Sequence, residues 1–171
     1  MTSPLLLVAS LLAPAMLSCA PRQDAMPIVR LVEYGVIRPV GPFVQRSDPT
    51  AAAGFTSHGT GNSVFEQRTT EIPAALGAAF GIRYRIENIR EGQAVLVEEI
   101  VHYPPMTRPN GTVVTEERTK DLVTSETGYI DQKFFYRLGQ PYEIVAGEWT
   151  LSVSVNGVRA IEQRFSLRAP K

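Results

Sequence analysis

Two segments of the chain alternate apolar and polar residues with a period of two. In residues 80–88 the large apolar side chains occupy every second position: Phe80, Ile82, Tyr84 and Ile86. Residues 147–155 repeat this pattern with Trp149, Leu151, Val153 and Val155. Because successive side chains of a β-strand point to opposite faces, this alternation is typical of a strand with one buried face. We therefore predict two core strands, and we expect Trp149 in the core rather than on a sugar-stacking surface.

Less regular patterns predict further strands. They lie within residues 28–37, 64–72, 94–101, 112–120 and 129–138. The segment 112–120 is polar and β-branched, which fits an edge strand. In the segment 129–138 the residues that share one face are Ile130, Phe134, Tyr136 and Leu138. Pro73 and Gly77 limit residues 74–79 to a turn or one short helix.

About seven short strands without a long helix predict an all-β protein. We expect an antiparallel, immunoglobulin-like β-sandwich, because a parallel sheet would need crossover helices that the pattern lacks. A length of 171 residues favours one domain, which we place at 28–168. Residues 45–63 are polar, small and rich in glycine, so a long loop is expected near that range.

The last predicted hairpin contains a conflict between its turn and its apolar pattern. Asn156-Gly157 is a two-residue turn signal that would pair Val155 with Val158. This pairing would send Ile161, Phe165 and Leu167 to the face opposite Trp149, since a slip of one residue reverses every side chain. We therefore predict a three-residue loop, or a bulge before Ile161, either of which brings Phe165 onto the face of Trp149.

The N-terminus carries no charged side chain before Arg22, and residues 5–17 are almost purely apolar. This run of 13 residues is shorter than the roughly 20 needed to cross a bilayer as a helix. It matches the apolar region of a secretory signal peptide, although no Lys or Arg precedes it. We predict a signal peptide of the lipoprotein type over residues 1–18, followed by a tether over residues 19–27.

Two sites of signal-peptide cleavage are consistent with the residues that follow the apolar run. Met16-Leu17-Ser18-Cys19 resembles a bacterial lipobox, in which the cysteine becomes the lipid-bearing N-terminus. Cleavage after Ser18-Cys19-Ala20 is the alternative, with Pro21 unfavourable after the cut. We expect lipid attachment at Cys19, because the only cysteine of the chain ends the apolar run. Ala20 then favours an outer membrane lipoprotein that faces the periplasm, and a soluble periplasmic protein is the alternative.

The composition excludes several functional classes. Lys and Arg number 17 and Asp and Glu number 17, so the net charge is zero and argues against nucleic acid as a partner. One cysteine forms no internal disulfide and no thiolate zinc site, and two histidines leave little for a metal centre. We expect no metal and no other cofactor.

The remaining candidate site lies in a proline-rich segment that we expect to be a loop. Its residues are His102, Tyr103, Pro104, Pro105 and Met106. Loops at the end of a rigid sandwich are a usual place for binding. A copper-binding periplasmic protein that uses His102 and Met106 is an alternative, although two soft ligands are too few for such a site.

A hydrolase with an unrecognised site is the other alternative, and it lacks a Gly-x-Ser-x-Gly elbow. Acidic residues occur as two neighbouring pairs, Glu98-Glu99 and Glu116-Glu117. Neighbours on a strand point to opposite faces, so one residue of Glu98-Glu99 must face the same side as the apolar residues of its strand. Paired carboxylates act as acid and base only when burial separates their pKa values. We assign no catalytic residue.

Several segments between Ile28 and Leu167 resemble an uncharacterised bacterial family, domain of unknown function 3859. The resemblance rests on Glu33-Tyr34-Gly35, Ile72-Pro73-Ala74, Gly77, Phe80-Gly81, His102, Pro104-Pro105-Met106, Pro109, Gly111, the run from Tyr142 to Thr150, and Phe165. It implies a β-sandwich in secreted or envelope proteins and supplies no activity. Together these observations predict an exported, lipid-anchored envelope protein with a non-catalytic binding or structural role. Its expected partner is another envelope protein or envelope component, and its expected contact with the membrane is through lipid alone.

Overall fold

The computed structural model describes residues 26–40, 43–47, 55–59 and 63–169. The predicted signal peptide and Cys19 therefore lie outside the described residues. In chain order the described strands are β1 (Ile28–Pro39), β2 (Phe43–Ser47), β3 (Phe55–Gly59), β4 (Ser63–Gln67), β5 (Glu71–Pro73), β6 (Ala79–Glu87), β7 (Ala94–Thr107), β8 (Val113–Thr124), β9 (Ile130–Arg137), β10 (Gly147–Val155) and β11 (Val158–Arg168). One 3₁₀ turn, η1 (Pro141–Glu143), precedes β10.

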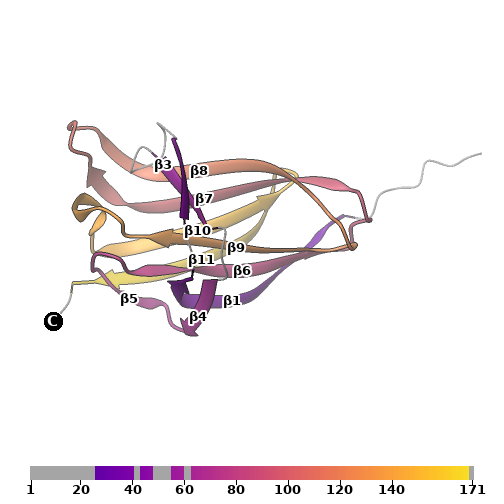
Figure 1. Ribbon diagram of the computed structural model, residues 1–171, viewed down its shortest axis with the longest axis horizontal. Coiled ribbons are helices and arrows are strands. Elements are labelled where there is room, and N and C mark those ends of the chain that lie inside the picture. The colour runs from indigo at the N-terminus through magenta and orange to yellow at the C-terminus, as the bar shows by residue number, and fades with distance from the viewer. Residues whose placement is uncertain (1–25, 41–42, 48–54, 60–62, 170–171) are drawn as a thin grey trace, which may run out of the picture.

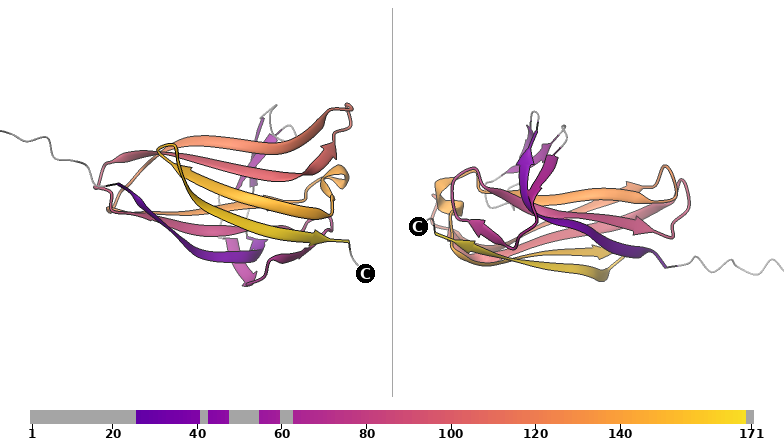
Figure 2. Two further views of the ribbon diagram at one scale, coloured as in Figure 1. Left: turned by 180° about the vertical axis from the view of Figure 1, so that it is seen from behind. Right: turned by 90° about the horizontal axis from the view of Figure 1, so that it is seen from below.

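The strands form two packed sheets and a separate hairpin. One sheet has the order β4-β1-β6-β9 and the other β5-β11-β10-β7-β8 (Figure 1). All strand pairs are antiparallel except β11 with β5, which is parallel. The hairpin β2–β3 projects away from the two sheets (Figure 2). The predicted immunoglobulin-like sandwich is confirmed, although it has more strands than the expected seven.

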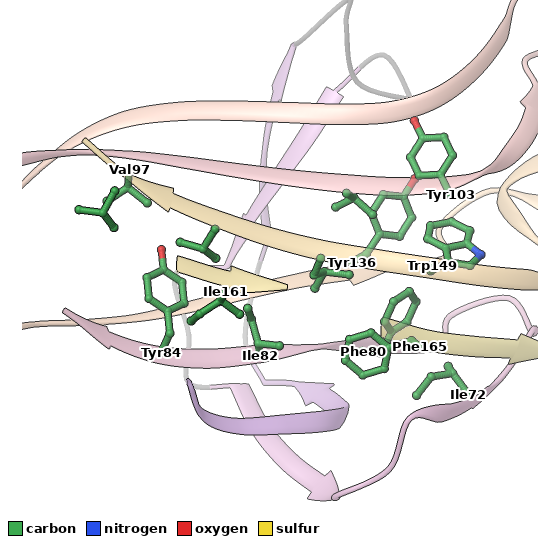
Figure 3. Close-up of a cluster of buried hydrophobic side chains, with 14 of the residues drawn as sticks. Ile72, Phe80, Ile82, Tyr84, Val97, Tyr103, Tyr136, Trp149, Ile161 and Phe165 are labelled. Carbon is green, nitrogen blue, oxygen red and sulfur yellow. The ribbon is translucent and has the colours of Figure 1, made fainter. Parts of the chain in front are cut away.

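The alternating residues of β6 and β10 form the centre of the core. Phe80, Ile82, Tyr84 and Ile86 are 0% exposed, as are Trp149, Leu151 and Val153. The ring of Trp149 lies 5.0 Å from the Tyr103 ring and 5.7 Å from the Phe80 ring (Figure 3). The Trp149 Nε1–H donates to the backbone oxygen of Val145 at 3.0 Å. Trp149 is therefore a core residue, as the alternation predicts.

The last hairpin resolves its conflict with a bulge. Val155 pairs with Val158 across Asn156 and Gly157, which have φ angles of +50° and +81°. The register then shifts between Val153 and Ser154, so that Val153 pairs with Ile161 and Trp149 with Phe165. The extra residue restores the large apolar side chains to the core face. The predicted bulge before Ile161 is confirmed.

Three expectations about irregular segments are wrong. The range 45–63 is not wholly a loop, because β2 and β3 lie partly or wholly within it. The range 64–72 contains parts of two short strands, β4 and β5, which belong to different sheets. The proline-rich segment 102–106 is part of β7 and not a loop. Its prolines are accommodated because the ladder with β8 is interrupted between His102 and Met106, where a missing N–H donor costs no ladder hydrogen bond.

Candidate functional site

The inner face of β7 is apolar except at its middle. Val95, Val97, Val101 and Tyr103 are buried on this face, and Glu99 takes the place between Val97 and Val101. Its neighbour Glu98 points to the outer face, where Arg118 Nη1 lies 2.8 Å and Lys120 Nζ 3.1 Å from its Oε1. The predicted split of this acidic pair is therefore confirmed, and Glu99 is the residue that faces inward.

The carboxyl group of Glu99 lies in a small pocket between the two sheets. The Tyr84 hydroxyl donates to Glu99 Oε1 at 2.8 Å. The pocket has a volume of about 60 Å³ and is lined by Tyr84, Val97, Glu99, Thr119, Asp121, Val123 and Gln132. These residues come from β6, β7, β8 and β9, so the pocket lies at the side where β8 and β9 are the outermost strands of their sheets. The sequence alone places one residue of Glu98-Glu99 on an inner face, but it neither singles out Glu99 nor brings Tyr84 and Gln132 to it.

Burial dominates the electrostatics of this pocket. Desolvation raises the pKa of Glu99 to about 7, the Tyr84 hydrogen bond opposes this shift, and the Asp121 charge adds to it. The pKa of the Tyr84 hydroxyl is also raised, by burial and by the nearby Glu99 carboxyl. A carboxyl group with a pKa near neutrality and a specific partner in a cleft is a functional-site candidate on physical grounds. The pocket can take up a proton, or a hydrogen-bond donor the size of a water molecule or an ammonium group.

A second inward carboxyl group, that of Glu143, has a structural role. Glu143 is 2% exposed, and its Oε1 accepts a hydrogen bond from the Tyr136 hydroxyl at 3.0 Å. Its Oε2 accepts from the backbone N–H groups of Gly139 and Gln140 at 2.7 Å each. Burial raises the pKa of Glu143, while these hydrogen bonds oppose the shift. Both oxygens are satisfied, so the group holds the turn that leads into β10.

Tyr136→Phe is expected to destabilise the fold by about 1–2 kcal/mol, because the buried Glu143 carboxyl loses one of its donors. The free energy of unfolding from urea titration measures this loss. Tyr129→Phe is the matched control: Tyr129 is 42% exposed, and its ring contact with Arg85 does not need the hydroxyl. Equal stability of the two variants would contradict the structural role of the Tyr136 hydroxyl.

The residues of the predicted loop site do not form one surface. Tyr103 and Met106 are 5% and 0% exposed and belong to the core, whereas Pro105 is exposed and Pro104 half-buried. His102 lies on the outer face, with its Nδ1 3.5 Å from Glu116 Oε2. His102 and Met106 thus point to opposite sides of β7 and share no copper site. The other histidine, His58, belongs to β3, and the structure does not describe the side chains of that strand.

No described residues form a metal or hydrolytic centre of the kinds considered above. Within residues 26–40, 43–47, 55–59 and 63–169 there is no group of three or more His, Cys, Asp and Glu side chains that could hold a metal ion. His102 and Glu116 are directly opposite on β7 and β8, and each side chain is nearly half exposed. This arrangement is an exposed cross-strand pair, whereas a catalytic histidine and its partner need a cleft.

The two packed sheets define the class of the protein as an immunoglobulin-like β-sandwich. A crystal structure of an immunoglobulin-like protein from Pseudomonas aeruginosa is similar, with a TM-score of 0.60 and 24% identity over 85% of this chain and 99% of that chain. The chain belongs to the family described as Domain of unknown function (DUF3859), whose model matches residues 25–167. The resemblance found in the sequence is therefore confirmed.

A second solved structure matches a smaller part of the chain. It is the Pseudomonas fluorescens alkylpurine DNA glycosylase AlkC bound to DNA with an abasic site analogue, at a TM-score of 0.43 and 19% identity over 58% of this chain and 28% of that chain. No curated protein sequence matches the chain. In the described residues no helix is long and apolar enough to span a membrane.

Proposed function

We propose that this protein is an exported, lipid-anchored envelope protein whose β-sandwich has a binding or structural role and no catalytic one. The observation that carries the proposal is the position of the only cysteine, which closely follows a 13-residue apolar run and lies seven residues before Met26, the first described residue. Membership of a family with an immunoglobulin-like fold and no defined activity is consistent with it. The lipid on Cys19 holds the domain at the outer membrane, facing the periplasm.

The binding role is supported by how the described side chains are used. Trp149, Phe80 and other aromatic residues fill the core. Glu143 is satisfied by three donors, and His102 pairs with Glu116 on an exposed face. In the Glu99 pocket a carboxyl group between the two sheets borders open space. A partner from the envelope, either a protein or another envelope component, is the class of ligand that we propose.

Cys19→Ala is expected to move the protein from the membrane fraction to the soluble fraction, because acyl chains supply about 0.8 kcal/mol per buried methylene and the variant has none. Membrane fractionation and incorporation of labelled palmitate measure the change. Ser18→Ala is the matched control, since a small residue before the cysteine keeps the lipobox pattern. Unchanged membrane retention and labelling in Cys19→Ala would refute the lipid anchor.

A further inference from the structure

Strand β8 is the last strand of the five-stranded sheet. In the described part of the chain it pairs only with β7, so its other side carries unpaired backbone N–H and C=O groups. Such an edge is a template for an additional strand, and charged residues along it prevent indiscriminate pairing. β8 has five charged residues between Glu116 and Asp121. The charges therefore restrict which segments could pair with this edge.

The two faces of β8 differ in charge. Thr119, Asp121 and Val123 face inward and line the pocket beside Glu99. Arg118 and Lys120 face outward, where the Glu98 carboxylate contacts both and the Glu116 carboxylate also contacts Arg118. The positive charges are thus neutralised on the outer face, and the pocket on the inner face presents two carboxyl groups. A strand that pairs with this edge would meet a negatively charged inner side.

The inner side also carries polar groups without complete partners. The structure shows no ion pair for Asp121 in the described residues, and Glu99 accepts one hydrogen bond, at Oε1. The Tyr103 hydroxyl is fully buried without a hydrogen-bond partner, and it points toward the β7–β8 side (Figure 3). Burial is the main cause of the raised pKa of this hydroxyl, and the charge of Glu117 on β8 adds to it. A carboxyl group such as that of Glu99, partly removed from solvent and with an oxygen still free to accept, gains from a partner that brings donors.

We propose that the edge of β8 receives an extended segment of a partner protein, which pairs as a further strand and directs a Lys or Arg side chain toward Glu99 and Asp121. Strand addition takes affinity from backbone hydrogen bonds and specificity from pockets for alternate side chains. The pocket volume of about 60 Å³ admits the charged end of such a side chain. This inference rests on the binding role proposed above and names the chemistry of the partner.

A second copy of the chain that paired antiparallel about Thr119 would fit this edge poorly. In an antiparallel pair of β8 strands centred on Thr119, Arg118 would lie opposite Lys120 and Glu117 opposite Asp121. Like charges in directly opposite positions are destabilising. An apolar strand would leave the inner carboxyl groups without donors. A basic extended segment is the occupant that matches the charges.

The test uses the full-length protein in detergent micelles and a nine-residue peptide that alternates threonine with lysine. Fluorescence anisotropy measures its binding at pH 8, and amide hydrogen exchange measures protection along β8. We expect the peptide to bind and to protect β8, and its counterpart with glutamate in place of lysine not to bind. N-methylation of alternate residues on its pairing side should abolish binding, because the strand hydrogen bonds are lost.

Variants of the protein locate the contact. Asp121→Asn and Glu99→Gln should each weaken binding at least about tenfold, since each removes one charge that faces the lysine. Glu116→Gln is the matched control, because Glu116 lies on the outer face of the same strand, and it should bind as the wild type does. Absence of binding, equal binding of the acidic peptide, or a loss in Glu116→Gln as large as that in Asp121→Asn would overturn the proposal. The Cys19→Ala fractionation is independent of all these outcomes, so failure here leaves the lipid anchor to be judged separately.

Discussion

In the wild-type protein the Glu99 carboxyl is expected to contribute a loss of about 3 kcal/mol of stability as the pH rises from about 4.5 to about 7, and Glu99→Gln should remove this contribution. The pKa of Glu99 is raised from 4.5 to about 7 by burial in the folded protein. Between these values the folded state binds more protons than the unfolded state, so stability falls as the pH rises and is constant above about pH 7. Glutamine removes the ionisation and keeps an acceptor for the Tyr84 hydroxyl.

Urea titrations of both proteins at pH 5, 6, 7 and 8 measure the effect. At pH 5 the two should be similar, and at pH 8 Glu99→Gln should be more stable by about 2–3 kcal/mol. Glu98→Gln is the control on the adjacent outer position, where Lys120 and Arg118 lower the pKa of the carboxyl group. Glu98→Gln should keep the decline between pH 5 and pH 7. A decline of the same size in Glu99→Gln would show that another group causes it.

Gly35→Ala is expected to destabilise the fold by about 4 kcal/mol, the sum of backbone strain and overpacking. Gly35 has a φ angle of +140°, which L-residues rarely adopt. A Cβ atom built on it would lie within van der Waals overlap of the Gln67 backbone oxygen on β4. Because the obstacle is backbone and not a flexible side chain, β1 and β4 would have to separate.

The matched control is Gly92→Ala. Gly92 also has a positive φ angle, +75°, but a Cβ atom there would meet no atom within 4 Å. Its cost is the left-handed conformation alone, about 1 kcal/mol. Thermal unfolding followed by circular dichroism compares the variants. If Gly35→Ala and Gly92→Ala had the same melting temperature, the close approach of β4 to Gly35 would not limit the residue at position 35.

Much of the sandwich can be predicted from local alternation. Phe80 to Ile86 and Trp149 to Val153 mark buried faces because the period of two is a property of each strand by itself. The bulge before Ile161 is also predictable, since the turn at Asn156 and the apolar pattern of β11 agree only with an extra residue. The continuation of β7 through Pro104 and Pro105 was not predicted, because it depends on an interruption of the β7–β8 ladder that the sequence does not display.

The sequence by itself determined the fold class, the inner faces of the main strands and the inward position of one residue of Glu98-Glu99. Only the tertiary structure decided that Tyr84 of β6, Gln132 of β9 and Asp121 of β8 meet Glu99 in one pocket. It also separated His102 from Met106, although only three residues lie between them. The physical reason is that periodicity specifies the face on which a side chain lies, whereas the partner across the interior depends on strand order, register and bulges that bring distant segments together.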